Sequence, residues 1–329
     1  MLRRLFSVIV VLLVGGMILV LLLDNEKNNS PDLIPSVPQM TVAPTPTNIL
    51  AEESETIPPA PTAVEVQQEQ PLLPLPPVDE AAKRLSVPDG FAIRIFADEL
   101  RGTPRFMTVG PEGEVYVSLY ASGEIARLPD RDDDGLADGV EIIAGGMNRP
   151  HGIEWHESWL YVAEAGRVCR LRDNDGDGLM ETWEQVTDNI PGAGGHTSRT
   201  LHFGPDGLLY VSAGSSCNVC AEDDPRRAAI LRFNPDGSIP ADNPFAADPD
   251  PRKQAVWAWG LRNSVDFLWT PSGALWANHN GRDNLVDAQG TYDSLPPEEI
   301  IIPVRGGMSH GWPYCYTAVN GINTGMEAE

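Results

Sequence analysis

The chain has 329 residues and a formal net charge of −24, from 23 Lys and Arg residues against 47 Asp and Glu residues. This excess of acid argues against a nucleic-acid-binding protein, which needs basic patches, and it suits cation binding and solubility outside a cell. Four cysteines are too few for a disulfide-built scaffold, and the length allows one large domain or two ordinary ones.

The N-terminal residues 5–23 form an uncharged apolar run about as long as a bilayer core requires. Arg3 and Arg4 precede the run, so the positive-inside rule predicts a cytoplasmic N-terminus and a translocated remainder. A cleaved signal peptide is the alternative, but the run is long for one and no small-x-small cleavage site follows it. We predict a transmembrane helix over residues 1–23 that acts as a signal anchor. The folded domain is then membrane-anchored and extracytoplasmic, in the periplasm or at the cell surface of a bacterium.

Residues 24–84 are rich in Pro, Thr, Glu, Gln and Ser and poor in aromatic residues. Such a segment cannot bury enough apolar surface to fold, and its prolines favour an extended, semi-rigid geometry. We interpret it as a disordered linker, which assigns residues 85–329 to the folded domain.

A short motif, a turn followed by an aromatic strand, recurs in the folded domain at residues 110–117, 155–162, 204–211 and 270–277. The turn contains Gly and Pro in all copies except 155–162. A period of 40–50 residues with only strand signals is typical of a β-propeller. The sequence therefore predicts an all-β fold with about four blades covered, as part of a longer propeller.

His196 lies in a glycine-flanked loop just before a predicted hairpin, with strands at residues 199–203 and 208–213 around a Gly-Pro-Asp-Gly turn. The second strand is apolar on both faces, which predicts a buried strand. His196 is therefore a candidate catalytic residue at the mouth of a sheet, or else a loop histidine bonded to the backbone. His151 holds the same position one blade earlier, whereas His202 lies within a strand and is expected to be structural.

Two loops have acids at positions 1, 3, 5 and 12 and glycine at position 6, which is the spacing of an EF-hand calcium loop. The predicted ligands are Asp130, Asp132, Asp134 and Glu141 in the first loop, and Asp173, Asp175, Asp177 and Glu184 in the second. The loops lie 43 positions apart, as equivalent loops of consecutive blades would. Structural calcium is the prediction, and solvated acidic turns are the alternative.

Cys217 and Cys220 are two residues apart, but no histidine follows to complete a c-type haem motif, and no second pair is present for zinc. In an exported protein, a local disulfide is favoured.

Arg262 and Asn263 lie at the start of a later predicted strand, and the planar guanidinium of Arg can bind carboxylates with two hydrogen bonds. A salt bridge is the alternative for Arg262. The polar loop at residues 278–283 would suit calcium through backbone carbonyls, or it is a plain hairpin loop.

Several of these segments together resemble the soluble, pyrroloquinoline-quinone (PQQ)-dependent sugar dehydrogenases, in particular the glucose/sorbosone dehydrogenase branch. The resemblance is carried by G-H-T-S-R (195–199), S-S-C-N-V-C (215–220), the stretch 229–245, W-G-L-R-N-S (259–264), N-G-R-D (280–283) and G-W-P (311–313). It is strongest from Gly195 to Pro313. The set is specific, although each motif alone is weak.

The resemblance implies a six-bladed propeller with PQQ in the central mouth and Ca²⁺ beside it. His196 would be the general base when a hydride passes from the sugar to the quinone. Arg262 and Asn263 would hold the cofactor, with His151 lining the same pocket, and the backbone carbonyls of Gly281 and Arg282 would bind Ca²⁺. The substrate would be an aldose or related sugar, and a separate cytochrome or quinone would accept the electrons.

The chain departs from the family in three ways. It ends before further cationic and aromatic cofactor contacts of the last blades, Arg282 replaces a residue that is often proline, and the two acidic loops are additions. Two other functions are therefore considered. One is a calcium-stabilised propeller that binds a partner without catalysis. The other is a lactonase-type hydrolase, which would need a ring of carboxylate and Asn metal ligands that the sequence does not show.

Overall fold

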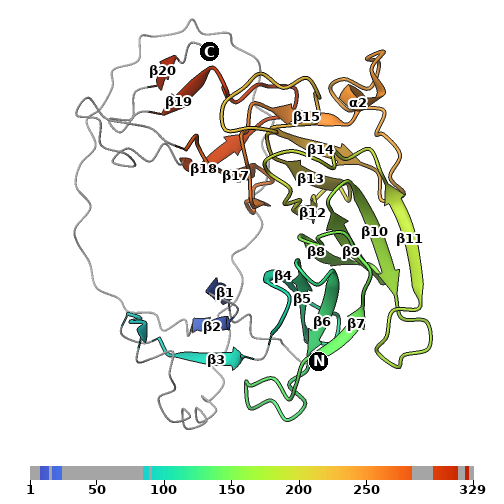
Figure 1. Cartoon of the computed structure of the whole chain (residues 1–329), viewed down its shortest axis with the longest axis vertical. Coiled ribbons are helices and arrows are strands. Elements are labelled where there is room, and N and C mark those ends of the chain that lie inside the picture. The colour runs from blue at the N-terminus through green and yellow to red at the C-terminus, as the bar shows by residue number, and fades with distance from the viewer. Residues whose placement is uncertain are drawn as a thin grey trace, which may run out of the picture.

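A run of antiparallel sheets, each a simple up-and-down meander, makes up most of the fold (Figure 1). The structure is a computed structural model, and it describes residues 8–14, 17–23, 84–88, 91–98, 100–283, 299–317 and 323–325. Every strand in these sheets pairs with its neighbours in the sequence. Short turns suffice for such pairing, which explains the many glycine-containing turns between strands.

Three sheets have four strands each. The first comprises β4 (Pro104–Val109), β5 (Val115–Leu119), β6 (Glu124–Leu128) and β7 (Glu141–Ala144). The second comprises β8 (Ile153–His156), β9 (Trp159–Glu164), β10 (Arg167–Arg172) and β11 (Thr182–Thr187). The third comprises β12 (Leu201–Phe203), β13 (Leu209–Ala213), β14 (Ala229–Phe233) and β15 (Val256–Trp259), with the short helix α2 (Pro251–Gln254) before β15.

The described residues also form three smaller sheets. The fourth blade contains β16 (Phe267–Trp269), β17 (Leu275–His279) and β18 (Glu299–Val304). A two-stranded sheet pairs β19 (Cys315–Thr317) with β20 (Asn323–Gly325), and a three-stranded sheet joins β1 (Val8–Val14), β2 (Met17–Leu23) and β3 (Ile93–Ala97).

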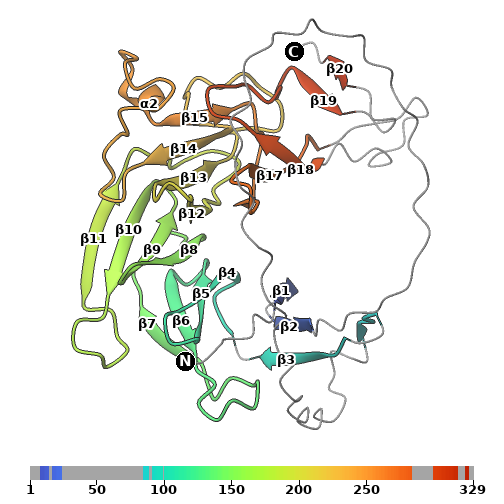
Figure 2. The ribbon, with the colours of Figure 1, turned by 180° about the vertical axis from the view of Figure 1, so that it is seen from behind.

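The blades follow one another around an arc, with the first strand of each blade innermost (Figures 1 and 2). The innermost strand β8 contacts both β4 and β12, and strands β7, β11 and β15 lie on the outside. This arrangement confirms the prediction of an all-β propeller with four blades in this chain.

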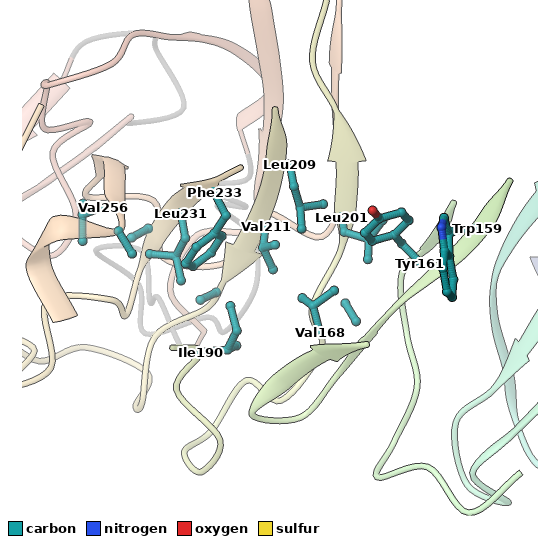
Figure 3. Packing of buried hydrophobic residues seen from close by; sticks show 14 residues of the cluster. Trp159, Tyr161, Val168, Ile190, Leu201, Leu209, Val211, Leu231, Phe233 and Val256 are labelled. Carbon is teal, nitrogen blue, oxygen red and sulfur yellow. The ribbon is translucent and has the colours of Figure 1, made fainter. Parts of the chain in front are cut away.

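The hydrophobic core lies between successive blades rather than inside one sheet. Figure 3 shows the cluster between the second and third blades, where Trp159, Tyr161 and Val168 face Leu201, Leu209 and Val211. The repeated aromatic residue of the sequence motif explains this packing, because in the first three blades it lies on the second strand and meets an aromatic ring of the next blade. The pairs are Tyr116 with Trp155, Tyr161 with Phe203, and Tyr210 with Trp269, with ring centroids 5.3, 4.8 and 4.9 Å apart.

The prediction of a transmembrane helix at the N-terminus is not supported. Residues Val8–Val14 and Met17–Leu23 are instead two strands that pair antiparallel, with Val8 opposite Leu23. The first is rich in β-branched residues, which favour strands, and a Gly-Gly pair, a hairpin signal, separates the two in the sequence. Within the described ranges, the protein has no helix whose length and apolarity would let it cross a bilayer. The predicted linker lies outside those ranges up to residue 83, so it stays a prediction.

Candidate active site

His196 lies in the loop before β12, and its ring is oriented by one neighbouring residue. Its Nδ1 lies 2.9 Å from the carbonyl oxygen of Ser215 and 2.9 Å from Ser215 Oγ. Ser215 Oγ donates its own proton to the Cys217 carbonyl at 2.7 Å, so it can only accept from the imidazole. The proton of a neutral His196 is therefore on Nδ1, and Nε2 keeps a lone pair.

The electrostatic environment keeps His196 neutral at pH 7. Burial lowers its pKa below the ordinary value, and the nearby positive charge of Arg262 lowers the pKa further, against the hydrogen bond to the Ser215 carbonyl. A neutral imidazole with an available Nε2 can accept a proton from a hydroxyl group.

Two buried arginines hold the His196 loop. Arg199 has no exposed surface, and its guanidinium donates to the carbonyls of His196 and Ser198, at 3.0 and 2.6 Å, and to that of Pro191. Arg227 reaches the His196 carbonyl from the other side at 3.5 Å. Backbone carbonyls of a loop thus take up the charge-assisted hydrogen bonds that buried arginines need.

Gly214, just after β13, lets His196 approach Asn263. A Cβ atom built on Gly214 would lie 2.5 Å from Asn263 Oδ1 and 2.6 Å from His196 Cβ. Only glycine therefore leaves both side chains where they are. The structure thus brings together two of the residues that the sequence placed in the site.

Arg262 joins the same cluster and is almost completely buried, with 3% of its surface exposed. Its carbonyl accepts from the backbone N–H of Ser215 at 2.7 Å, which ties it to the His196 support. Its guanidinium donates to the backbone and side-chain oxygens of Asn218, both at 2.9 Å, and to Asp283 Oδ2 at 2.8 Å. Nη1 makes a longer contact of 3.4 Å with the Asn280 carbonyl. The loop that carries Gly281 and Arg282 therefore lies against this guanidinium.

His151, which the family resemblance predicts to line the cofactor pocket, lies in a buried position against Phe106. Its ring packs on Phe106, with centroids 4.7 Å apart, and Nδ1 lies 3.5 Å from Thr200 Oγ1. Only 3% of the residue is exposed. Burial lowers the pKa of His151 to about 4, and the charge of Arg105 adds to this effect. Within the described ranges, His151 forms no hydrogen bond with the residues around His196.

The predicted acidic loops gather most of their carboxylates, but not the glutamates at position 12. The carboxylate oxygens cluster within 4.8 Å in each loop: Asp130, Asp132 and Asp134 in the first, and Asp173, Asp175, Asp177 and Glu181 in the second.

Glu141 and Glu184 instead pair with arginines. Glu141 lies opposite Arg127 in the β6–β7 ladder, and Glu184 lies opposite Arg170 in the β10–β11 ladder. Both form ion pairs at 2.6 Å, and hydrogen bonds from Arg131 and Arg127 hold the pKa of Glu141 below its ordinary value. The reason is local: an EF-hand loop continues into a helix, whereas here position 12 falls in or at the start of a strand, where it faces its cross-strand partner.

Cys217 and Cys220 are joined by a disulfide, and the other two cysteines are free thiols, Cys169 buried and Cys315 exposed. His202, for which a structural role is predicted, bridges three blades: Nδ1 lies 2.8 Å from Glu154 on β8, and Nε2 lies 2.9 Å from Asp266 next to β16. Burial opposes its charge, but the carboxylates of Asp266 and Glu154 outweigh burial and raise the pKa of His202 to about 9.

Sequence reasoning missed the support of the site, namely Arg199, Ser215, Gly214, Asn218 and Asp283. Four of the five stand within the motifs of the family resemblance, which was the available signal: Arg199, Ser215, Asn218 and Asp283. Their roles depend on contacts over long sequence separations, such as 44 residues between Asn218 and Arg262, and no local pattern encodes these.

Comparison with known proteins gives one family. The family model described as glucose/sorbosone dehydrogenase matches residues 156–326, just over half of the chain. The aldose sugar dehydrogenase YliI of Escherichia coli is 30% identical over 130 residues, which cover 39% of this chain and 31% of the relative. Quinoprotein glucose dehydrogenase B of Acinetobacter calcoaceticus is 23% identical over 256 residues, or 64% of this chain and 50% of the relative.

Solved structures agree on the fold. The PQQ-bound aldose sugar dehydrogenase of Streptomyces coelicolor superposes with a TM-score of 0.52 at 22% identity, over 67% of this chain and 65% of that one. The PQQ domain of pyranose dehydrogenase from Coprinopsis cinerea gives a TM-score of 0.53 at 19% identity, over 66% and 55%. The chain spans between about a third and three fifths of the length of the curated relatives it matches.

Proposed function

The chain belongs to the glucose/sorbosone dehydrogenase family, and from this premise we propose that it is part of a PQQ-dependent dehydrogenase that oxidises an aldose or related sugar at its anomeric carbon. The observation that carries the proposal is the state of His196: its Nδ1 proton is fixed by Ser215, its Nε2 makes no hydrogen bond within the described residues, and its Cβ and Asn263 Oδ1 both lie close to Gly214. A general base for an alcohol proton needs this arrangement.

The donors around Gly214 fit a quinone that carries several carboxylates. Arg262 provides a buried cationic fork, and Asn263 provides an amide that makes no side-chain hydrogen bond within the described part of the chain. Arg262 Nη1, with one contact of 3.4 Å, would turn to such a carboxylate most easily. When bound, PQQ supplies the acceptor for the hydride that leaves the sugar.

The chain's own residues would accept the proton and orient the reacting groups. His196 Nε2 would take the proton of the anomeric hydroxyl group as the C–O double bond forms and the hydride leaves the same carbon. The hydrogen bond from Nδ1 to the Ser215 carbonyl would then stabilise the imidazolium. A positioned base of this kind typically contributes about 10²–10⁴-fold to the rate.

Calcium is part of the proposal at two kinds of site. The backbone carbonyls of Gly281 and Arg282 would hold Ca²⁺ beside the cofactor, in a loop that Asn218 fixes through Asp283 N and Asp283 O at 2.8 and 3.0 Å. The two acidic loops would hold structural Ca²⁺, since oxygen ligands in that number suit this ion.

We further propose an extracytoplasmic location and a separate cytochrome or quinone as electron acceptor. The Cys217–Cys220 disulfide supports the location, because disulfides persist in oxidising compartments.

The first test is a cofactor titration of the whole protein with PQQ and Ca²⁺, followed by dye reduction with a panel of aldoses. We expect His196→Gln to bind the cofactor as wild type does and to lose about 10²–10⁴-fold in kcat. The matched control is His156→Gln, because His156 stacks on Phe203 at a ring distance of 3.6 Å, outside the site. A wild-type protein that binds no cofactor would overturn the proposal.

That negative result would favour the second candidate, a calcium-stabilised propeller that binds a partner without catalysis. One observation supports it: the Arg262 guanidinium is already paired with Asp283 and Asn218. Calcium-dependent stability without cofactor binding would identify this case.

A further inference from the structure

The disulfide-closed loop Cys217–Cys220, between β13 and β14, contacts both halves of the proposed site. Asn218, inside the loop, accepts two hydrogen bonds from Arg262, through its backbone oxygen from Nε and through Oδ1 from Nη2. Its side chain also accepts from the backbone N–H of Asp283 and donates to the Asp283 carbonyl. Asn218 therefore sets both the direction of the Arg262 fork and the place of the loop that carries Gly281.

The same loop reaches His196 through Ser215. The Cys217 carbonyl accepts the Ser215 hydroxyl proton at 2.7 Å, and this bond leaves Ser215 Oγ with only lone pairs toward His196 Nδ1. If the Cys217 carbonyl moved away, the Ser215 hydroxyl could donate to Nδ1 and would compete with the Nδ1 proton that the Ser215 carbonyl accepts. The share of imidazole with its proton on Nε2, where it blocks the base, would then rise.

The disulfide restricts the backbone at the two positions that matter. It closes a ring of four residues around Asn218 and begins at Cys217, whose carbonyl is the Ser215 acceptor. Outside the ring, the segment is anchored by the Ser216 backbone N–H, which donates to Glu222 at 2.7 Å. Both cysteines are partly exposed, so a small reductant has access to the bond.

We propose that the Cys217–Cys220 disulfide loop is a positioning element of the dehydrogenase site, with Asn218 orienting Arg262 and the Cys217 carbonyl adding to the preference of His196 for the Nδ1–H tautomer. The catalytic relevance of the loop rests on the proposed function, but the measurement of the His196 tautomer does not depend on it. Reduction by a phosphine breaks the Sγ–Sγ bond and yields two thiols with two electrons and two protons, while the phosphine becomes its oxide with oxygen from water. The site would then lose tautomer selection and cofactor affinity together.

The decisive readout is the His196 tautomer, measured by long-range ¹H–¹⁵N correlation on the histidine-labelled full chain without cofactor, with assignment by His196→Gln. We expect Nδ1 to carry the proton in the oxidised wild type. In the Cys217→Ser/Cys220→Ser variant the ratio of the two His196 tautomers should change by about 3- to 10-fold, the factor that corresponds to the net free energy of one hydrogen bond. If that variant fails to fold, brief phosphine reduction of folded wild-type protein gives the same comparison. An unchanged tautomer after verified reduction overturns the inference.

Asn218→Ala separates the two roles of the loop. It removes the side-chain contacts with Arg262 and Asp283 but keeps the Cys217 carbonyl, so the tautomer should stay while PQQ binding weakens about 10-fold. Val219→Ala is the matched control in the same ring and should change neither. Unchanged binding in Asn218→Ala, with a wild type that binds, overturns the role of Asn218. A wild type without PQQ binding refutes the proposed function alone, since the tautomer measurement still decides the positioning role.

Discussion

Replacing Gly214 by alanine tests whether His196 and Asn263 form one site. The new Cβ would lie 2.5 Å from Asn263 Oδ1 and 2.6 Å from His196 Cβ. An ordinary contact of 3.4 Å therefore requires displacements of about 0.9 Å at Asn263 and about 0.8 Å at His196. Overpacking of this size costs about 1–3 kcal/mol of unfolding free energy, and misplacement of a catalytic group by about 1 Å costs about 10²-fold in rate.

The assay combines denaturant unfolding with steady-state kinetics of the cofactor-loaded enzyme. The matched control is Gly139→Ala, because a Cβ atom at Gly139 meets nothing within 4 Å, so stability and kcat should stay at wild-type values. Wild-type stability and wild-type kcat in Gly214→Ala would refute the close approach of the two side chains. Lost stability with an unchanged kcat would show that the two residues do not act together.

Two further predictions concern charge. The pKa of His202 is raised to about 9, so its ion pairs stabilise the fold fully below about pH 6.5 and lose this contribution as the pH rises toward 9. His202→Gln should cost about 1–3 kcal/mol at pH 6 and much less at pH 9.5; an equal loss at both pH values would contradict the charge argument. Ca²⁺ at 100 times its dissociation constant should stabilise the fold by about 2.7 kcal/mol. In calorimetry, Asp177→Asn should reduce the stabilisation by Ca²⁺, whereas the exposed control Asp223→Asn should leave it unchanged. An equal stabilisation of both variants by Ca²⁺ would exclude the second acidic loop as the site.

The propeller could be predicted from the sequence because its blades are stabilised by a repeated local unit. Tyr116, Tyr161 and Tyr210 recur at nearly constant spacing, and each packs against the next blade. At the N-terminus, where the predicted transmembrane helix is not supported and the structure has two paired strands, the length and apolarity of the run could not distinguish a helix from strands. The spacing of the acidic loops could not predict the ion pairs of Glu141 and Glu184, because EF-hand spacing presumes a following helix, whereas both glutamates lie opposite arginines in a strand ladder.

The sequence could predict individual site residues that stand in a motif, but not the contacts that those residues make. His196 and Arg262 could be named from the sequence, but the atoms that give them their states come from other blades or loops. Asn218 and Asp283 are 65 residues apart and still exchange two hydrogen bonds. Such pairs arise from the closing geometry of the blades, which strand periodicity does not contain.

The protonation of two histidines shows why this support is needed. A net charge of −24 creates a field that in general favours protonated imidazole, which is the wrong form for a base. His202 has a carboxylate within hydrogen-bond distance of each ring nitrogen, and these two negative charges raise its pKa to about 9. His196, six residues earlier, has its pKa lowered instead, by burial and by the positive charge of Arg262. An acidic protein can thus keep a neutral base only where local cations and burial outweigh its overall field. Besides the cofactor contact proposed for it, Arg262 therefore lowers the pKa of His196 together with burial and favours the neutral imidazole.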